Sequence, residues 1–175
     1  MKAEKTILEG VLVIQPEIFS DSRGFFLESF NRKKYQSLGI SNEFVQDNHS
    51  RSVRNVLRGL HFQKNNPQGK LVRCTKGKVL DVIVDIEKKS ETFGKHVMVE
   101  LSEENGTQVW IPPGYAHGFL VLSEYADFNY KCTAYYDPND QRGVIWNDPF
   151  LNIQWPVTKP ILSEKDSMNP YLTTS

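Results

Sequence analysis

The sequence is poor in cysteine and has no long stretch of a single chemical character. Its 175 residues include only two cysteines, Cys74 and Cys132, and no CxxC pair. Each cysteine lies inside an apolar, strand-like run, which favours buried free thiols in a reducing compartment. No apolar stretch approaches the ~18 residues that a membrane-spanning helix needs. The sequence therefore disfavours a membrane-spanning protein.

Charge of one sign is also scarce. The chain carries 21 basic and 21 acidic residues, so its formal net charge is zero, and no run of like charge occurs. Binding to nucleic acid or to a membrane surface therefore has no electrostatic support. The N-terminal apolar stretch is short and broken by Glu9, unlike a signal peptide, so we expect a cytoplasmic protein. The length fits one domain, residues 1–175, with a sizeable core.

What the sequence does predict is a hairpin with two reactive side chains. Residues 56–63 favour a strand, and a second strand begins with Lys70 after a turn rich in Asn, Pro and Gly. Strict alternation places His61 on the same face as Gly59, whose missing side chain lets another group approach the backbone. His61 and Lys70 are candidates for a base and a charge stabiliser. The alternative is a half-buried histidine with local hydrogen bonds and a solvated lysine.

Short strand-like segments recur along the chain at roughly ten-residue spacing, with turn signals between them. One helix is expected at residues 31–38, with Asn31 as its N-cap and Gly39 just past its end. A charged loop is expected at residues 51–54. Besides the hairpin, strands are expected at residues 11–14, 25–30, 79–86, 96–101, 108–111 and 127–136. This pattern predicts an all-β jelly roll with one or two short helices.

Residues 79–86 form the clearest of these strands. Its even positions are apolar, whereas its odd positions place Asp81 and Asp85 on one face with Val79 and Ile83. Carboxylates beside buried aliphatic residues suggest the lining of a pocket. A sheet face that is open to water is the alternative.

The sequence predicts that a metal site is absent. Residues 112–117 match the second half of the cupin metal pattern, PxGxxH, but the first half requires His-x-His and then a glutamate. Here Gln63 stands two positions after His61, and Lys70 lies near the place of the acid. Two imidazoles, an amide and an ammonium make a poor transition-metal site. We therefore expect no metal and no cofactor.

The remaining reactive side chains suit proton transfer. No serine or cysteine stands in a nucleophile-elbow context. A histidine base, a tyrosine acid and a lysine near a developing oxyanion are the groups needed to move a proton next to a ketone. For Tyr130 alone, the alternative is a packing residue with a bonded hydroxyl. The candidates are His61, Lys70, Asp81, His117, Tyr130 and Asp166.

Seven motifs occur in one order between about Leu12 and Asp166, nearly the whole chain. They are RGFF (23–26), FVQDNHS (44–50), LRGLHFQ (57–63), QGKLVR (68–73), WIP with AHGF (110–112 and 116–119), YK (130–131) and IWND (145–148). Together they resemble the dTDP-4-dehydrorhamnose 3,5-epimerase family. The resemblance implies a metal-free, cupin-type jelly roll that works as a homodimer on dTDP-4-dehydro-6-deoxy-glucose in dTDP-L-rhamnose synthesis.

The resemblance also implies roles for individual residues. His61 matches the base, and Asp166 matches the carboxylate that orients and polarises it. Tyr130 matches the acid on the opposite face of the sugar ring, and Lys70 matches the group that stabilises the enolate. Arg23 and Phe25 match residues that such dimers extend to the partner's nucleotide. Other matched positions contact the substrate: Glu28, Gln46, Asp47, Asn48, Arg58, His117 and Lys165.

One position departs from the family pattern, because Gln141 stands where some relatives have a glutamate near the substrate. This puts that single contact in doubt. Two rival functions remain open at this point. Relatives of the same fold epimerise only carbon 3 or only carbon 5, or isomerise the ketone. A catalytically silent cupin would bind the sugar nucleotide without exchanging its protons.

Overall fold

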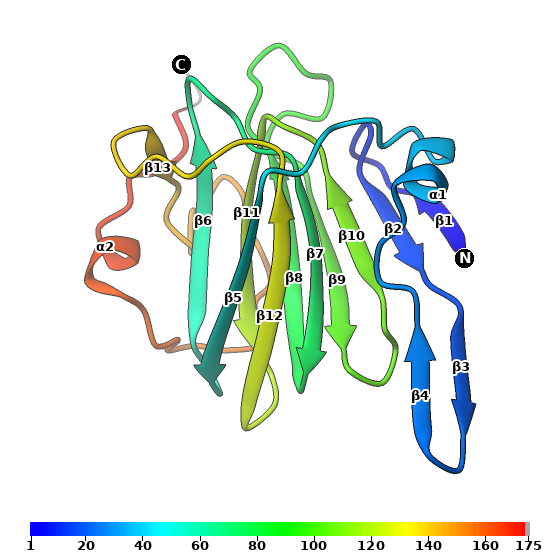
Figure 1. The fold of residues 1–175 in the computed structure, drawn as a ribbon. Helices are drawn as coiled ribbons and strands as arrows, with labels where there is room; N and C mark the ends of the chain where they lie inside the picture. The colour runs from blue at the N-terminus through cyan, green and yellow to red at the C-terminus, as the bar shows by residue number, and fades with distance from the viewer. Residues whose placement is uncertain (174–175) are drawn as a thin grey trace.

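Two antiparallel sheets face each other, and a separate hairpin extends beside them (Figure 1). The computed structural model describes residues 1–173. The larger sheet has the strand order β1 (Lys2–Lys5), β2 (Leu12–Gln15), β10 (Gln108–Ile111), β7 (Lys70–Lys76), β12 (Tyr125–Cys132) and β5 (Gln46–Val53). The smaller sheet has the order β13 (Gln141–Gly143), β6 (Leu57–Gln63), β11 (Tyr115–Val121), β8 (Lys78–Asp85) and β9 (His96–Ser102). The hairpin consists of β3 (Ile18–Asp21) and β4 (Gly24–Leu27). The all-β jelly roll is thereby confirmed.

Two short helices flank the sheets. The first, α1 (Arg32–Ser37), begins as expected, because the Asn31 side chain accepts hydrogen bonds from the amides of Lys33 and Lys34. The second, α2 (Glu164–Ser167), is capped in the same way by Ser163. Its single turn is too short to give a periodic pattern in the sequence. None of the helices within residues 1–173 is long and apolar enough to cross a membrane.

An apolar core fills much of the space between the sheets. The inward positions of β8 contribute Val79 and Ile83, and β11 and β12 contribute Phe119 and Phe128 from opposite sheets. The rings of these two phenylalanines stack with centroids 4.2 Å apart. Because Asp81 lies between Val79 and Ile83 on the same face of β8, its carboxylate is carried into this interior.

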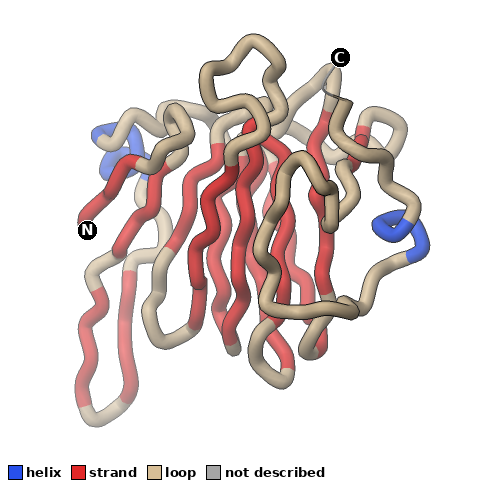
Figure 2. Tube along the Cα trace, turned by 180° about the vertical axis from the view of Figure 1, so that it is seen from behind, coloured by secondary structure: helices blue, strands red, loops and turns tan. Residues whose placement is uncertain are grey.

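The outer face of the smaller sheet and part of the outer face of the larger sheet are covered as well. The C-terminal segment, residues 144–172, runs across the outside of the smaller sheet (Figure 2), where Leu151 packs against Val82 and Val84 of β8. This cover explains why the even positions of β8 are apolar. The region around α1 covers the larger sheet in a second cluster, in which Tyr35 and Trp110 are buried.

The hairpin expected from residues 56–63 and the strand that begins at Lys70 does not form, because β6 and β7 belong to different sheets. Four further expectations about local structure are wrong. The strand expected at residues 25–30 ends at Leu27, and Phe25 and Phe26 are 64% and 68% exposed. The charged loop expected at residues 51–54 continues β5 as far as Val53, because β5 pairs with β12 along its whole length. The long strand expected at residues 127–136 ends at Cys132. The fourth, the alternation around Gly59, is described with the site.

Candidate active site

A cavity of about 370 Å³ lies between the sheets, a size that suits a small-molecule ligand. Phe119 and Phe128 contribute apolar surface to it. Its polar lining comes from neighbouring strands of both sheets: β5, β12 and β7 of the larger sheet and β13, β6 and β11 of the smaller one. The predicted site residues that line the cavity are Gln46, Asn48, Arg58, His61, Lys70, His117, Tyr130 and Gln141.

His61 and Asp166 form a close pair at the cavity wall. The distance between His61 Nε2 and Asp166 Oδ1 is 2.5 Å, and Asp166 is buried. Burial acts to raise the pKa of Asp166, but the hydrogen bond and charge of His61, with further bonds from Ser163 and the Gly59 amide, lower it overall. An Nε2–H that donates to this carboxylate leaves Nδ1 as the basic nitrogen. The pair therefore has the arrangement of an oriented general base.

A bulge in β6 sets the direction of His61. In the pairing of β11 with β6, His117 lies opposite His61 and Phe119 lies opposite Arg58, so Gly118 alone faces two residues. Arg58 and His61 consequently line the same cavity, and the expected sharing of a face by Gly59 and His61 is wrong. The approach to Gly59 comes from the opposite strand: a Cβ there would lie 2.7 Å from Gly118 Cα. Glycine is needed at this crossing because two backbones meet.

Lys70 begins β7 and lines the cavity from the larger sheet. Its ammonium makes no hydrogen bond or ion pair with any side chain or backbone group of residues 1–173. Burial lowers the pKa of Lys70, whereas the charges of Cys132 and Asp81 act in the opposite direction. A desolvated cation without a partner is costly for folding, and it is positioned to meet an anionic group of a ligand.

Tyr130 lies on β12 and lines the same cavity. In the described part of the chain its hydroxyl has no hydrogen-bond partner, so the alternative of a packing residue with a bonded hydroxyl does not apply. Burial raises the pKa of Tyr130, the thiol of Cys132 acts in the same direction, and the charge of Arg58 opposes both. The phenol is therefore protonated at neutral pH and can donate a proton.

A second histidine–aspartate pair lies beside the first. His117 Nε2 is 2.7 Å from Asp81 Oδ1, and both residues are buried. Asp81 is fully buried and is not among the residues that line the cavity, so it reaches the cavity only through its partner His117. Asp85, from the same face of β8, instead accepts hydrogen bonds from Ser90 and Thr92 in the following loop.

Amide side chains and tyrosine connect the residues at one side of the cavity. Gln46 donates to Asn48 at 3.0 Å and accepts from the Tyr136 amide at 2.9 Å. Gln141 Oε1 accepts hydrogen bonds from the Tyr136 hydroxyl at 2.6 Å and from Lys165 at 3.2 Å. Sequence analysis missed Tyr136, which was expected to belong to a longer β12. The turn that follows at residues 137–140 is the one local signal that could have placed it in a loop.

Comparison with known proteins identifies the family that shares this architecture. The model of the dTDP-4-dehydrorhamnose 3,5-epimerase family matches residues 5–174. The curated enzyme of that name from Salmonella typhimurium is 54% identical over 171 residues, covering 96% of this chain and 93% of that protein. The Escherichia coli enzyme is 55% identical over 169 residues, covering 95% and 91%. This chain belongs to the dTDP-4-dehydrorhamnose 3,5-epimerase family.

Solved structures of the epimerase family share the fold. The RmlC epimerase from Legionella pneumophila, in complex with dTDP-4-keto-L-rhamnose, superimposes with a TM-score of 0.95 at 50% identity, covering 98% of this chain and 92% of that chain. ChmJ from Streptomyces bikiniensis, a 3′-monoepimerase in complex with dTDP-quinovose, gives a TM-score of 0.90 at 34% identity, covering 95% and 86%. The jelly roll described above is thus of the cupin type.

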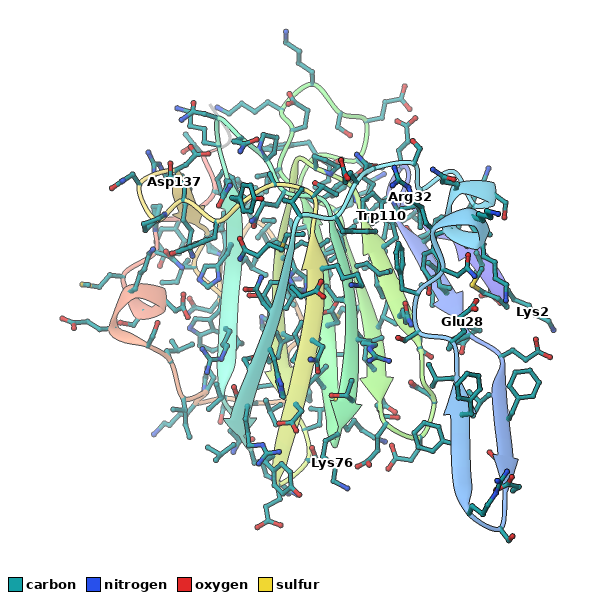
Figure 3. The ribbon with its side chains drawn as sticks, in the orientation of Figure 1. Lys2, Glu28, Arg32, Lys76, Trp110 and Asp137 are labelled. Atoms are coloured by element: carbon teal, nitrogen blue, oxygen red, sulfur yellow. The ribbon has the colours of Figure 1, made fainter. Side chains whose placement is uncertain are left out.

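Several positions matched to the epimerase family lie away from this cavity. Arg23 and Phe25 are exposed on the hairpin β3–β4, where Arg23 pairs with Asp21. Glu28 pairs with Lys34 at 2.8 Å on the same side of the molecule as α1 (Figure 3). Asp47 pairs with Lys131 at 3.0 Å. Within one chain these four side chains are not brought to His61.

The broken metal pattern has a structural counterpart. The Gln63 amide donates to the backbone of Asn66 and Tyr135 and accepts from the Asp137 amide, so it holds loops together. Among residues 1–173, no group of three or more His, Cys, Asp or Glu side chains is arranged to hold a metal ion. The absence of a functional metal from this epimerase remains a prediction.

Proposed function

We propose that the protein is a dTDP-4-dehydrorhamnose 3,5-epimerase, converting dTDP-4-dehydro-6-deoxy-D-glucose to dTDP-4-dehydro-L-rhamnose in dTDP-L-rhamnose biosynthesis. The proposal rests on one observation above all. In a chain of this family, the His61–Asp166 pair lies at one wall of a cavity, and the unpartnered cation of Lys70 and the unpartnered phenol of Tyr130 line the same cavity from the other sheet. These are the groups that proton transfer next to a ketone requires.

The first step removes a proton from the sugar. The carbon 4 ketone acidifies the hydrogens at carbons 3 and 5, and the electron pair of the broken C–H bond moves to the ketone oxygen as an enolate. We propose that His61 takes the proton while Asp166 stabilises the imidazolium that forms. Lys70 is proposed to meet the enolate oxygen, where a charged donor in a water-poor site is worth about 3–4 kcal/mol.

The second step returns a proton from the other side of the ring. Inversion needs an acid on the face opposite the base, so it needs a second residue, and Tyr130 is proposed for this role. Because burial raises the pKa of Tyr130, the phenol keeps its proton until the enolate is present. His61 then releases its proton to solvent and the phenolate of Tyr130 takes one up, which restores the starting state.

The other lining residues are proposed to hold the sugar nucleotide. Arg58, which donates to Ser52 at 2.9 Å, carries a permanent charge that suits a diphosphate. His117, Gln46 and Asn48 offer polar groups from neighbouring strands. Gln141 and Lys165 are joined by a hydrogen bond and are proposed to bind the substrate together.

We also propose a homodimer in which the hairpin β3–β4 reaches the partner's cavity. The hairpin extends beyond the two sheets (Figure 1) and exposes Phe19, Phe25 and Phe26. Exposed aromatic side chains on a projecting arm are typical of an interaction surface. A contact of this kind would bring Arg23, Phe25 and Glu28 to a second copy of the site.

Light scattering at working concentration should give twice the chain mass, and the melting temperature should rise with protein concentration because dimerisation stabilises the fold by mass action. A species of 20.1 kDa alone would contradict the dimer. A cytoplasmic location is proposed as well, since both cysteines are buried and free.

The activity is tested by proton NMR of the product formed in deuterated water. A 3,5-epimerase should exchange hydrogen for deuterium at two carbons and invert both. Exchange at carbon 3 alone would indicate a monoepimerase, the activity named for ChmJ. Binding of dTDP without any exchange would indicate a silent sugar-nucleotide-binding protein and would refute the proposal.

A further inference from the structure

Asp81 carries an unexplained buried oxygen. Its side chain is fully buried in the middle of β8, and Oδ1 contacts His117 at 2.7 Å. Its other oxygen, Oδ2, has no hydrogen-bond partner among the described residues. A buried acceptor without a partner costs folding free energy, so an aspartate with a purely structural role would be expected to use both oxygens.

Other buried aspartates of the chain show that structural pattern. Asp85 uses Oδ1 for the Glu87 amide and Oδ2 for Ser90 and Thr92. Asp148 uses Oδ1 for the amides of Phe150 and Leu151 and Oδ2 for the Leu172 amide. Each of these carboxylates ties loop segments together, whereas Asp81 makes one bond, to a residue of the cavity.

The neighbours of Asp81 show what its charge acts on. His117 lies opposite His61 across β11 and β6 and lines the cavity. Asp81 and the thiol of Cys132 both act electrostatically to raise the pKa of the Lys70 ammonium. Because burial raises the pKa of Cys132, that thiol is neutral at neutral pH, and the carboxyl group of Asp81 is the remaining influence on Lys70.

We propose that Asp81 is a positioning residue for the epimerisation: its carboxylate orients His117 toward the sugar and balances the charge of the Lys70 ammonium. This inference rests on the function proposed above. Asp81 accepts the Nε2–H of His117, which fixes the tautomer and leaves Nδ1 to meet a sugar hydroxyl. The unused oxygen leaves negative charge available to the cation of Lys70, which has no partner of its own.

The pH dependence follows from the groups around Lys70. The titratable and charged groups that line the cavity with Lys70 are His61 and Arg58 on β6, His117 on β11, Tyr130 on β12 and Tyr136 in the loop that follows β12. Asp81 on β8 and Cys132 on β12 act on Lys70 from outside this lining. Removing the negative charge of Asp81 makes the ammonium easier to deprotonate. Activity that needs protonated Lys70 is then lost at a lower pH than in the wild type.

The test compares Asp81→Asn with Asp85→Asn, two isosteric changes on the same face of one strand. Asp81→Asn should lower kcat by about 10–100-fold, the range found when the group that orients a metal-binding histidine is lost. The basic limb of its kcat profile should move to lower pH, and its melting temperature should stay the same or rise. Asp85→Asn should do the opposite, with a lower melting temperature and unchanged kcat and pH profile.

If the wild type is active and Asp81→Asn has the same kcat and pH profile as the wild type, the role of Asp81 is overturned but the proposed function is not. An Asp81→Asn protein that does not fold, or that melts earlier with normal kcat, would also overturn it. A wild type that exchanges no protons would overturn the proposed function itself. One measurement needs no Asp81 variant: nitrogen-15 NMR of the wild type should show His117 protonated at Nε2, and an unprotonated Nε2 would contradict the proposal.

Discussion

Buried polar groups follow two different rules in the loops and in the cavity. In the loops, Asp140 accepts hydrogen bonds from Asn65 and from the Asn66 amide through both of its oxygens, and Asp148 is equally saturated. In the cavity, the ammonium of Lys70 and the hydroxyl of Tyr130 have no partner among residues 1–173, and neither does one oxygen of Asp81, whose partner His117 lines the cavity. Among the loops of the described residues, the Asn169 amide nitrogen is the buried exception. Saturated groups stabilise the fold, whereas unsaturated ones cost stability, and three of them lie in or beside the cavity. The difference indicates where substrate binds.

The largest effect is expected from removing the base. His61→Ala should reduce solvent exchange at both sugar carbons by about 10²–10⁴-fold, the usual contribution of a general base. Deuterium incorporation followed by NMR measures it. His49→Ala is the matched control, because His49 is exposed on β5 outside the cavity and its loss should leave exchange unchanged. Residual exchange within tenfold of the wild type would remove His61 from the role.

Lys70→Met should separate activity from stability. Loss of the charged donor should reduce kcat by about 10²–10³-fold. The same change should raise the melting temperature, because burial of the ammonium lowers its pKa and therefore costs folding free energy at neutral pH. This cost is complete below the folded-state pKa and fades as the pH rises toward the unfolded value, so the gain in stability should shrink in alkaline buffer.

Lys76→Met is the control for that variant, since Lys76 stands at the other end of β7 and pairs with Glu103 in solvent (Figure 3). It should change neither kcat nor the melting temperature appreciably. Thermal melts across pH and steady-state rates provide the two readouts. A Lys70→Met protein that is less stable than the wild type would contradict the idea that this cation is retained against stability.

The smallest kinetic effect is expected at a saturated carboxylate. Asp148→Asn places an amide NH₂ where the Leu172 amide now donates, so two donors face each other. The free energy of unfolding should fall by about 1–3 kcal/mol, the cost of a buried group left without its partner. Denaturant titration measures the loss, and kcat should stay at the wild-type value. A kinetic defect as large as the Lys70→Met defect would erase the contrast between loops and cavity.

The sequence could predict features that depend on neighbouring residues. Asn31 indicated the start of α1, and the odd and even positions of residues 79–86 indicated which side chains of β8 enter the interior. Both follow from local periodicity or capping, which a single chain segment carries. The two strands that carry His61 and Lys70 were predictable for the same reason, but the hairpin expected between them was wrong, because β6 and β7 belong to different sheets.

Features that depend on distant contacts could not be predicted in this way. The bulge that turns His61 into the cavity arises because Gly118, on another strand, crosses Gly59. Asp166 reaches His61 from 105 positions away in the chain, on a helix of one turn. Only the resemblance to known epimerases assigned Asp166 to His61, and nothing local in the sequence indicated that His117 and Asp81 pair.

The most direct test of opposite-face proton transfer is the ratio of deuterium exchange to inversion in Tyr130→Phe. The substitution keeps the aromatic ring and removes the only proton that the side chain can donate. The variant should still introduce deuterium from the His61 side at a reduced rate while forming little inverted product. Tyr125→Phe, on the same strand β12, should behave as the wild type. Unimpaired inversion in Tyr130→Phe would contradict the assignment, and exchange and inversion lost in equal proportion would mean that the hydroxyl also helps to form the enolate.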